Sequence, residues 1–407
     1  MLKTPNAPFA SLLDIVSGVQ EFRLSPSDKK DEGKIGITVK DEKTLVVRLT
    51  SNADYLPSIL CHPSFSVIND NKLVFSGPFT LSNKTKDSIV LKKNPHYWDA
   101  DNVRLPSIRF IISDNTDENT YLYNTGKIDW IIDGVHTSKI LSFSDISISP
   151  QFGTEYFFFR PVKRPWDNPT LRLALLNAID WEKLQQDSIV KATSLLVQLP
   201  GYPEIYGVPE FDMDIALEMM EEAGYTNSST TQSTEPPVIT VAVPEGEYAT
   251  TLAQTLAENW NALGIKMQIL QVPNATYFQS VQDLDADLFV YNWIGDFADP
   301  MAFLELFRSE SGLNVTGWKD KTFDSLLQEA STLKDEQRFE KLAEAEQYMI
   351  DQGIIIPISH TVALNILDRN IVKGWYENAL NIHPLKNLYI GEQINPSNIV
   401  RLDIEKK

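Results

Sequence analysis

Cysteine and histidine are scarce in this sequence of 407 residues. The single cysteine, Cys61, cannot form a disulfide within the chain. No motif of the kinds H-E-x-x-H or C-x-x-C is present. Five histidines are scattered along the chain without the spacing of metal ligands: His62, His96, His136, His360 and His383. We therefore expect neither a bound metal nor a cofactor.

Positive charge is also in short supply, with 36 Lys and Arg residues against 55 Asp and Glu residues and a formal net charge of −19. A phosphate backbone repels an acidic protein, so we expect no nucleic-acid partner. Long apolar runs are missing too, since none approaches the roughly 20 residues that span a bilayer. At the N-terminus, Asp14 interrupts the best apolar stretch and no basic region precedes it. We therefore expect no export signal in this chain.

What is present fits a globular protein of more than one domain. Apolar residues make up 43% and charged residues 22%, and at about 150 residues per domain the length predicts two or three lobes. Residues 64–155 are rich in strand patterns, whereas residues 156–370 alternate between helix and strand patterns around a polar linker at 226–237. Trp166 and Arg172, near the start of the second stretch, are interpreted as structural. The fold class that we predict is α/β.

Several local signals predict individual elements. Residues 36–49 and 77–94 alternate apolar and polar positions around a polar turn, as hairpins do. Asn168 followed by Pro169 is typical of a helix start. Residues 238–270 show the order strand, helix, strand of a parallel crossover unit. The first turn of this unit holds two glutamates and no glycine-rich phosphate loop, which excludes a dinucleotide site.

The stretch "NWIGDFADP", residues 292–300, runs from an apolar strand into two aspartates. Asp299 precedes Pro300 and is predicted to cap the helix that follows. Asp296 lies between two aromatic residues that would bury its carboxylate, and an unpaired buried carboxylate costs several kcal/mol. Asp296 is therefore either a solvated loop acid or a functional acid that meets a cation.

Five stretches together resemble one protein family. They begin with "SGPFTLSNKTKDSIVLKKNPHYWDADNVRLPSIRFIISDNTDENTYLYNTGKIDW", residues 76–130. Four others follow in the order of the family: "YFFFRPVKRPWDNPTLRLALLNAID", "ALEMMEEAGY", "LAENWNALGIKMQI" and "NWIGDFADPMAFLELF". The sequence is similar to the extracellular solute-binding proteins of ABC transporters of the peptide/nickel class, also called solute-binding family 5. Within this family, the sequence pattern most resembles that of the oligopeptide-binding proteins.

The resemblance implies a fold and an activity. The family has a two-lobed, periplasmic-binding-protein-like fold of class II, or cluster C, with a hinge. Its oligopeptide-binding members hold a peptide in extended form between two lobes and deliver it to the permease subunits of an ABC importer. They act in the periplasm or at the outer face of the cytoplasmic membrane, some as lipoproteins, and they carry out no catalysis.

The resemblance also assigns site residues. The aspartate of the family that pairs with the α-ammonium group of the peptide corresponds to Asp296. Asn292, Trp293 and Ile294 would offer backbone groups to the peptide as to an added strand. Phe297, beside Asp296, completes the ligand-binding set that we predict.

The resemblance places the parts of the family along the chain. Residues 1–63 are predicted to be a remnant of the second domain, because "PFASLLDIVSGVQEF" resembles a stretch deep inside that domain. Residues 64–155 and 371–407 would form the first lobe, and residues 156–370 the second lobe, with the ligand-site strand at 287–300. We therefore expect an N-terminally truncated member that lacks the first part of the main lobe.

The sequence leaves other functions open. Within the family, the solute is alternatively a dipeptide, a metal chelate or haem, and the same fold also serves as the ligand-sensing domain of a regulator. In another class, a glycoside hydrolase would use Asp296 and Asp299 as its two carboxylates, although carboxylate pairs with this spacing are common in loops.

Overall fold

The computed structural model describes residues 2–4, 7–66, 74–225 and 235–391, which form two compact units. The first unit comprises Met1–Ser66 and Phe152–Thr361, and the second comprises Val67–Gln151 and Val362–Lys407. The chain passes between the units in two long strands that contribute to both. Each unit combines two ranges that are far apart in the sequence.

The boundaries of the units differ from the predicted lobe boundaries by three to nine residues. The predicted breaks after residues 63, 155 and 370 compare with observed breaks after residues 66, 151 and 361. Residues 1–63 pack within the first unit and do not form a unit of their own. Their assignment to the second domain of the family stays a prediction. The end of the predicted first lobe, residues 392–407, lies outside the described residues, as do residues 226–234 of the predicted linker.

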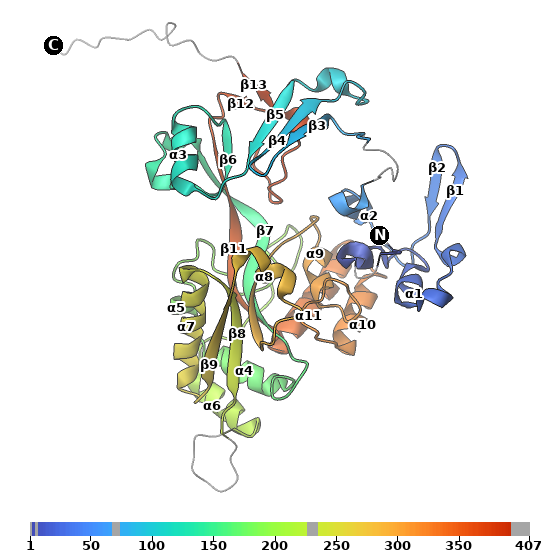
Figure 1. Cartoon of the computed structure of the whole chain (residues 1–407). Coiled ribbons are helices and arrows are strands. Elements are labelled where there is room, and N and C mark those ends of the chain that lie inside the picture. Colours follow the sequence, from blue (N-terminus) through green and yellow to red (C-terminus); the bar gives the residue numbers. More distant parts are fainter. Residues whose placement is uncertain (1, 5–6, 67–73, 226–234, 392–407) are drawn as a thin grey trace, which may run out of the picture. The chain divides into compact units, whose positions relative to one another are not determined.

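The first unit is built on a mixed sheet in which the neighbouring strands follow the order β11, β7, β10, β8, β9 (Figure 1). β10 pairs antiparallel with β7 and parallel with β8, and β8 pairs parallel with β9. The bounds of these strands are β7 Ile146–Phe159, β8 Val238–Pro244, β9 Lys266–Val272, β10 Leu288–Ile294 and β11 Ile355–Leu367. The predicted crossover unit is confirmed, because the helix that joins β8 to β9 packs on both strands.

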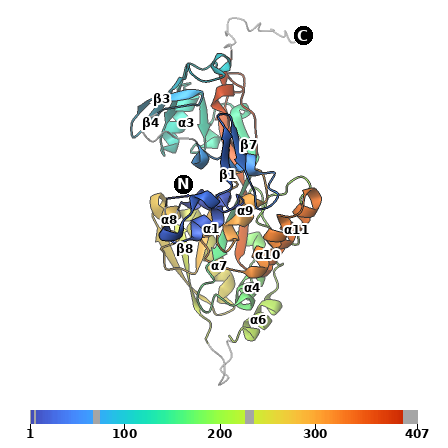
Figure 2. The ribbon, with the colours of Figure 1, turned by 90° about the vertical axis from the view of Figure 1, so that its right-hand side faces the viewer.

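The helices of the first unit surround this sheet. They are α1 Val19–Leu24, α2 Leu56–Ile59, α4 Pro169–Asn177, α5 Trp181–Leu184, α6 Met213–Glu222, α7 Glu247–Asn261, α8 Asn274–Ser280, α9 Met301–Leu304, α10 Lys321–Ala330 and α11 Asp335–Asp351. Short 3-10 turns add η1 Pro8–Leu13, η2 Ser27–Lys29, η3 Glu32–Lys34, η4 Pro63–Phe65 and η8 Glu305–Phe307. α10 and α11 pack against each other and lie side by side in both views (Figures 1 and 2). In the described part of the chain, every helix is too short or too polar to cross a membrane.

The helix α4 shows how local sequence sets an element. The Asn168 side chain accepts a hydrogen bond from the Thr170 backbone N–H at 3.0 Å, and Pro169 opens the first turn. This arrangement confirms the predicted start. Trp166 and Arg172 are both buried, and the Arg172 guanidinium donates to the backbone carbonyl of Trp166. Their predicted structural role is confirmed.

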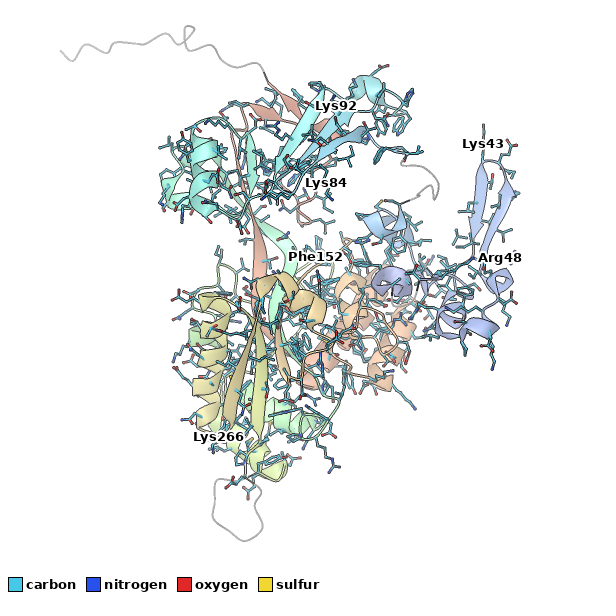
Figure 3. The ribbon with its side chains drawn as sticks, in the orientation of Figure 1. Lys43, Arg48, Lys84, Lys92, Phe152 and Lys266 are labelled. Atoms are coloured by element: carbon cyan, nitrogen blue, oxygen red, sulfur yellow. The ribbon has the colours of Figure 1, made fainter. Side chains whose placement is uncertain are left out.

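Aromatic side chains fill the core beneath β7 and β10. Phe158 and Phe289 are fully buried, and their rings stack with centroids 5.2 Å apart. In the middle of β7, Phe152, which is labelled in Figure 3, meets Phe303 edge to face at 4.8 Å. Each such pair adds about 0.5–1.5 kcal/mol to the burial of its surface. The last part of β10 is therefore held on a rigid support.

The N-terminal segment, defined here as residues 7–66, belongs to the first unit. Its hairpin β1 Ile37–Asp41 with β2 Thr44–Val47 confirms the predicted pattern, with Val39 opposite Leu45. The carboxylate of Asp14 fastens the segment, because it accepts hydrogen bonds from Arg23 at 2.6 Å and from Arg308 at 3.1 Å. Arg308 lies just after η8, so this contact joins distant parts of the sequence.

The second unit contains a three-stranded antiparallel sheet. Its strands are β3 Phe79–Lys84, β4 Ser88–Lys93 and β5 Ser107–Ile111, and the β3–β4 pairing confirms the second predicted hairpin. The remaining elements are η5 Ala100–Asn102, α3 Thr116–Asn124, β6 Trp130–Ile132, η6 Thr137–Lys139, η7 Phe143–Asp145, β12 Val372–Lys373, η9 Leu385–Asn387 and β13 Tyr389–Ile390. The last three residues of β11 pair with β6 in this unit.

Candidate functional site

Among the described residues, the second half of β10 has a strand neighbour on one side only. β10 pairs with β7 over its whole length, from Leu288 opposite Phe159 to Ile294 opposite Gly153. Its pairing with β8 covers only Leu288 and Phe289. The hydroxyl of Tyr277 lies where the two strands separate, 2.8 Å from the carbonyl oxygen of Val290. Beyond this point, no described strand pairs with that edge of β10.

The register with β7 decides which backbone groups face the open edge. The N–H of Gly295 donates to the carbonyl of Phe152 on β7 at 2.8 Å. In an antiparallel ladder, alternate residues turn both backbone groups to the same neighbour. Trp293 therefore faces β7, whereas Asn292 and Ile294 present their N–H and C=O groups to the open edge. For Trp293 this differs from our expectation, because β7 already uses its backbone groups.

The side chain of Trp293 has a partner of its own. Its indole N–H donates to the backbone carbonyl of Ala302 in α9 at 2.8 Å. Trp293 lies on the face of the sheet opposite to Asn292, because successive strand residues alternate. The tryptophan therefore ties the end of β10 to the following helix. Its predicted ligand contact stays a prediction.

Asp296, two residues after β10, meets a histidine from the N-terminal segment. The Oδ1 atom of Asp296 lies 3.4 Å from Nε2 of His62, and 18% of the Asp296 side chain is exposed. The Ser64 N–H donates to Nδ1 of His62 at 3.2 Å. A ring nitrogen that accepts carries no proton, so this geometry fits a neutral imidazole with its Nε2–H toward the carboxylate.

The charge of Asp296 is thus only partly compensated. Burial raises the pKa of the Asp296 carboxyl, and the positive charge that His62 can carry opposes this shift. Within the described residues, His62 is the only basic side chain within 4.0 Å of Asp296. A neutral imidazole supplies a dipole and not a full charge. The carboxylate remains suited to a cation that comes from outside the chain.

Phe297 packs behind Asp296. It is 2% exposed, and its ring stacks on that of Tyr55 with centroids 5.8 Å apart. The ring of Phe9 packs in turn on His62 at 4.4 Å. These aromatic contacts hold the N-terminal segment against the end of β10. The structure gives Phe297 a packing role, and its predicted ligand contact stays a prediction.

Asp299 is occupied within the protein. Its carboxylate accepts a hydrogen bond from the Met301 N–H at 3.0 Å, which confirms the predicted cap at the start of α9. Both carboxylate oxygens also accept from the Arg338 guanidinium, at 2.8 and 2.9 Å, in a buried pair. A glycoside hydrolase needs two carboxyl groups that reach its substrate. Because Arg338 binds both carboxylate oxygens of Asp299, only Asp296 of the two aspartates could reach a substrate.

The sequence model of the bacterial extracellular solute-binding proteins, family 5, middle region, matches residues 2–314. The chain belongs to this family. It is 25% identical over 365 residues to the dipeptide-binding protein DppE of Bacillus subtilis, covering 82% of this chain and 66% of that protein. It is 26% identical over 393 residues to the oligopeptide-binding protein OppA of the same organism, covering 86% and 71%. The chain thus spans about two thirds to three quarters of the length of these relatives.

Solved structures share the fold. The crystal structure of Haemophilus influenzae OppA in complex with the peptide RPPGFSPFR superposes with a TM-score of 0.78 at 21% identity. The match covers 96% of this chain and 80% of that one. The predicted family and the predicted two-lobed α/β fold are confirmed. The family binds solutes outside the cell, whereas the hinge stays a prediction.

Sequence reasoning missed a second carboxylate near the open edge of β10. Glu155 on β7 lies directly opposite Asn292 in the strand register. Its Oε2 atom accepts a hydrogen bond from the Tyr248 hydroxyl at 2.6 Å and lies 3.5 Å from Oγ of Ser359. Burial raises the pKa of Glu155, while these two hydrogen bonds lower it. Nothing in the local sequence "GTEYFFF" distinguishes this glutamate from a surface residue.

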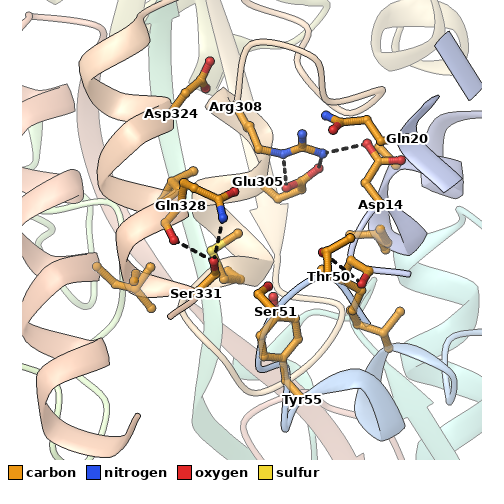
Figure 4. Close-up of a pocket in the computed structure, with 18 of the residues that line it drawn as sticks. Asp14, Gln20, Thr50, Ser51, Tyr55, Glu305, Arg308, Asp324, Gln328 and Ser331 are labelled. Carbon is orange, nitrogen blue, oxygen red and sulfur yellow. Dashed lines mark hydrogen bonds and ion pairs between the residues drawn. The ribbon is translucent and has the colours of Figure 1, made fainter. Parts of the chain in front are cut away.

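A cavity of about 350 Å³ lies between the N-terminal segment and helices α9 to α11 (Figure 4). Phe297 contributes to its wall from behind Asp296. Three of the charged groups that line the cavity pair with one another: Arg308 binds both Glu305 and Asp14, as the dashed lines show. The volume suits a small ligand, but Arg308, Glu305 and Asp14 already compensate one another's charge. We therefore place the candidate site at the edge of β10.

Proposed function

We propose that this chain binds peptides in extended form along the open edge of β10, as the solute-binding component of an ABC importer that delivers them to its permease subunits. One observation carries the proposal: within the described residues, the edge of β10 that no strand pairs with ends beside a half-buried carboxylate that lacks a full countercharge. The curated relatives, which are named as dipeptide- and oligopeptide-binding proteins, and the solved relative with a bound peptide support it.

The open edge explains how many different peptides would bind. Asn292 and Ile294 offer two N–H and two C=O groups at the spacing of a strand, so a peptide can add as the next strand. Each hydrogen bond contributes about 0.5–1.5 kcal/mol net, whatever the side chain of the peptide residue. Recognition of the ligand therefore depends mainly on its main chain.

The carboxylate of Asp296 sets the direction of the peptide. Asp296 follows the C-terminal end of β10, so a peptide with its α-ammonium group there runs antiparallel to β10. The ammonium group takes the place of the His62 Nε2–H and supplies the full positive charge that the neutral imidazole lacks. Removal of one partner of a buried charged pair costs about 3–5 kcal/mol, which corresponds to roughly two to four orders of magnitude in affinity.

The test is calorimetric titration with a mixed-sequence peptide of four or five residues. Asp296→Asn and N-acetylation of the peptide should each weaken binding by at least about a hundredfold, and together hardly more than either alone. Asp285→Asn is the matched control, because the same charge is lost from a side chain that is 93% exposed. If the acetylated peptide binds as tightly as the free amine, the proposed role of Asp296 is wrong.

The proposal also covers the location of the protein and the alternative functions. Peptide transport places the protein in the periplasm or at the outer face of the cytoplasmic membrane. A sensing role in a regulator or another solute, such as a metal chelate or haem, has no specific support in the site. The described residues hold no group of three or more His, Cys, Asp or Glu side chains placed to bind a metal.

A further inference from the structure

Glu155 is an enclosed carboxylate without a countercharge. No Lys, Arg or His side chain of the described residues forms an ion pair with it within 4.0 Å. The two hydrogen bonds from Tyr248 and Ser359 both end on Oε2, and no described residue donates to Oε1. A half-buried carboxylate that is stabilised only by neutral hydroxyls gains from a cation that approaches its second oxygen.

Glu155 lies beside the proposed peptide track. It is the direct partner of Asn292 in the β7–β10 ladder, and directly opposed residues project from the same face of a sheet. Asn292 is exposed on that face, and Ile294, on the same face, is 41% exposed. The partner of Ile294 on β7 is Gly153, and the side chains of Ile294 and Thr361 fill the space that a side chain at Gly153 would take. Asn292 and Ile294 are thus the exposed residues of this face, at the edge where the peptide would pass.

Tyr248 crosses β10 at the level of Asn292. It belongs to the first turn of α7, which follows β8, and its hydroxyl reaches Glu155 on β7. Since β10 lies between β8 and β7 in the sheet, the Tyr248 side chain spans β10 and is 46% exposed there. Burial, Glu155 and Asp187 raise the pKa of Tyr248, so the phenol keeps its proton and the surroundings are acidic.

The distance to Glu155 selects long ligand side chains. Adjacent strands lie about 4.8 Å apart, so a peptide added at the edge of β10 runs about 10 Å from β7. A short side chain of the peptide cannot cross this gap. A lysine or arginine side chain can follow the ring of Tyr248, where cation–π attraction adds about 0.5–1 kcal/mol at an exposed site. Its charged end then meets Oε1 of Glu155.

We propose that Glu155 and Tyr248 form a subsite that favours peptides with a lysine or arginine at the position facing Asn292. This inference rests on the proposed function and adds a side-chain preference to it. Arg160 and Lys163, the next basic residues along the chain, are engaged elsewhere, with the carbonyl of Leu284 and the carboxylate of Asp285. The subsite therefore takes its cation from the ligand.

The experiment compares pentapeptides of otherwise uniform alanine sequence. Each carries one lysine, or one norleucine as its neutral counterpart, at positions two to five in turn. With the wild-type chain, one position should bind lysine at least about tenfold more tightly than norleucine. Glu155→Gln should abolish this preference and leave the affinity for the norleucine peptide unchanged. Glu155→Asp, which keeps the charge, should retain a reduced preference, and this variant serves if Glu155→Gln does not fold.

The outcomes separate this inference from the proposed function. Asp296→Asn should weaken all the peptides alike and keep the preference for lysine. If Glu155→Gln retains the full preference, or if no position of the wild-type chain prefers lysine, the subsite is wrong while peptide binding stands. If no peptide binds to the folded wild-type chain, the proposed function fails and this inference fails with it.

Discussion

The imidazole of His62 and the carboxylate of Asp296 lie 3.4 Å apart, although one residue belongs to the N-terminal segment and the other follows β10. The backbone N–H of Ser64 donates a hydrogen bond to Nδ1, the other ring nitrogen of His62. The contact therefore places Nε2 of His62 beside the carboxylate of Asp296. Several consequences can be measured.

The first prediction concerns stability and pH. Burial raises the pKa of Asp296 above its ordinary value of 3.8, so the folded protein binds this proton more tightly than the unfolded chain does. Its contribution to stability is complete below pH 3.8 and is lost as the pH rises through the raised pKa. Asp296→Asn should therefore raise the Tm at pH 7 by about 1–3 °C and leave it unchanged near pH 3. A lower Tm at pH 7 would contradict this prediction.

The second prediction concerns competition for Asp296. A peptide ammonium group has to displace the His62 ring from Asp296, a contact at 3.4 Å that contributes no more than a neutral hydrogen bond, about 0.5–1.5 kcal/mol. His62→Ala should therefore tighten the binding of free-amine peptides about two- to tenfold in calorimetry at pH 7.5. N-acetylated peptides, which leave Asp296 unpaired, serve as the control and should not gain. Weaker binding of the free-amine peptide would show that His62 supports the ligand and does not compete with it.

Local sequence signals predicted the elements that depend on near neighbours. Asn168 with Pro169 marked the start of α4, and alternation marked the hairpins, because caps and turns involve residues a few positions apart. The full length of β11 could not be predicted in this way, since His360 and Thr361 interrupt its apolar pattern in the middle. Asp299 was predicted as a cap from the proline that follows it.

The partners of the site residues could not be predicted. His62 beside Asp296, Glu155 opposite Asn292 and Arg338 on Asp299 all join segments that are far apart in the sequence. The direction of the backbone groups of each β10 residue likewise depends on the register with β7, and a shift by one residue reverses it. The candidate residues can be found in the sequence, but the strand pairing of the folded sheet decides which of them face the ligand.

The third prediction separates structure from binding at Asp299. Breaking its buried pair with Arg338 leaves an uncompensated guanidinium, at a cost of about 3–5 kcal/mol in the free energy of unfolding. Asp299→Asn should show this loss in urea denaturation followed by tryptophan fluorescence. The double variant Asp299→Asn with Arg338→Met should lose less, because no charge stays buried alone. Peptide affinity measured in native buffer should stay within threefold, and a larger loss would give Asp299 a part in binding.

The last prediction concerns the attachment of the N-terminal segment. Asp14 is buried between two arginines, and its contact with Arg308 ties residues 7–66 to the helices that follow β10. Asp14→Ala leaves both guanidinium groups without this carboxylate, although Arg308 keeps Glu305. The segment should then detach more often, because local opening needs less free energy than global unfolding.

Limited proteolysis can measure this opening. Cleavage within residues 24–50 should become several-fold faster in Asp14→Ala, while the fragment that begins after the N-terminal segment resists digestion as before. Asp28→Ala, which removes an exposed carboxylate from the same segment, is the matched control and should be cut at the wild-type rate. Since His62 lies in this segment, its detachment also releases Asp296, so free-amine peptides should bind to Asp14→Ala more tightly than to the wild type, and no more tightly than to His62→Ala. Equal rates of cleavage in Asp14→Ala and the wild type would show that the aromatic contacts of Phe9 and Tyr55 hold the segment without the ion pair.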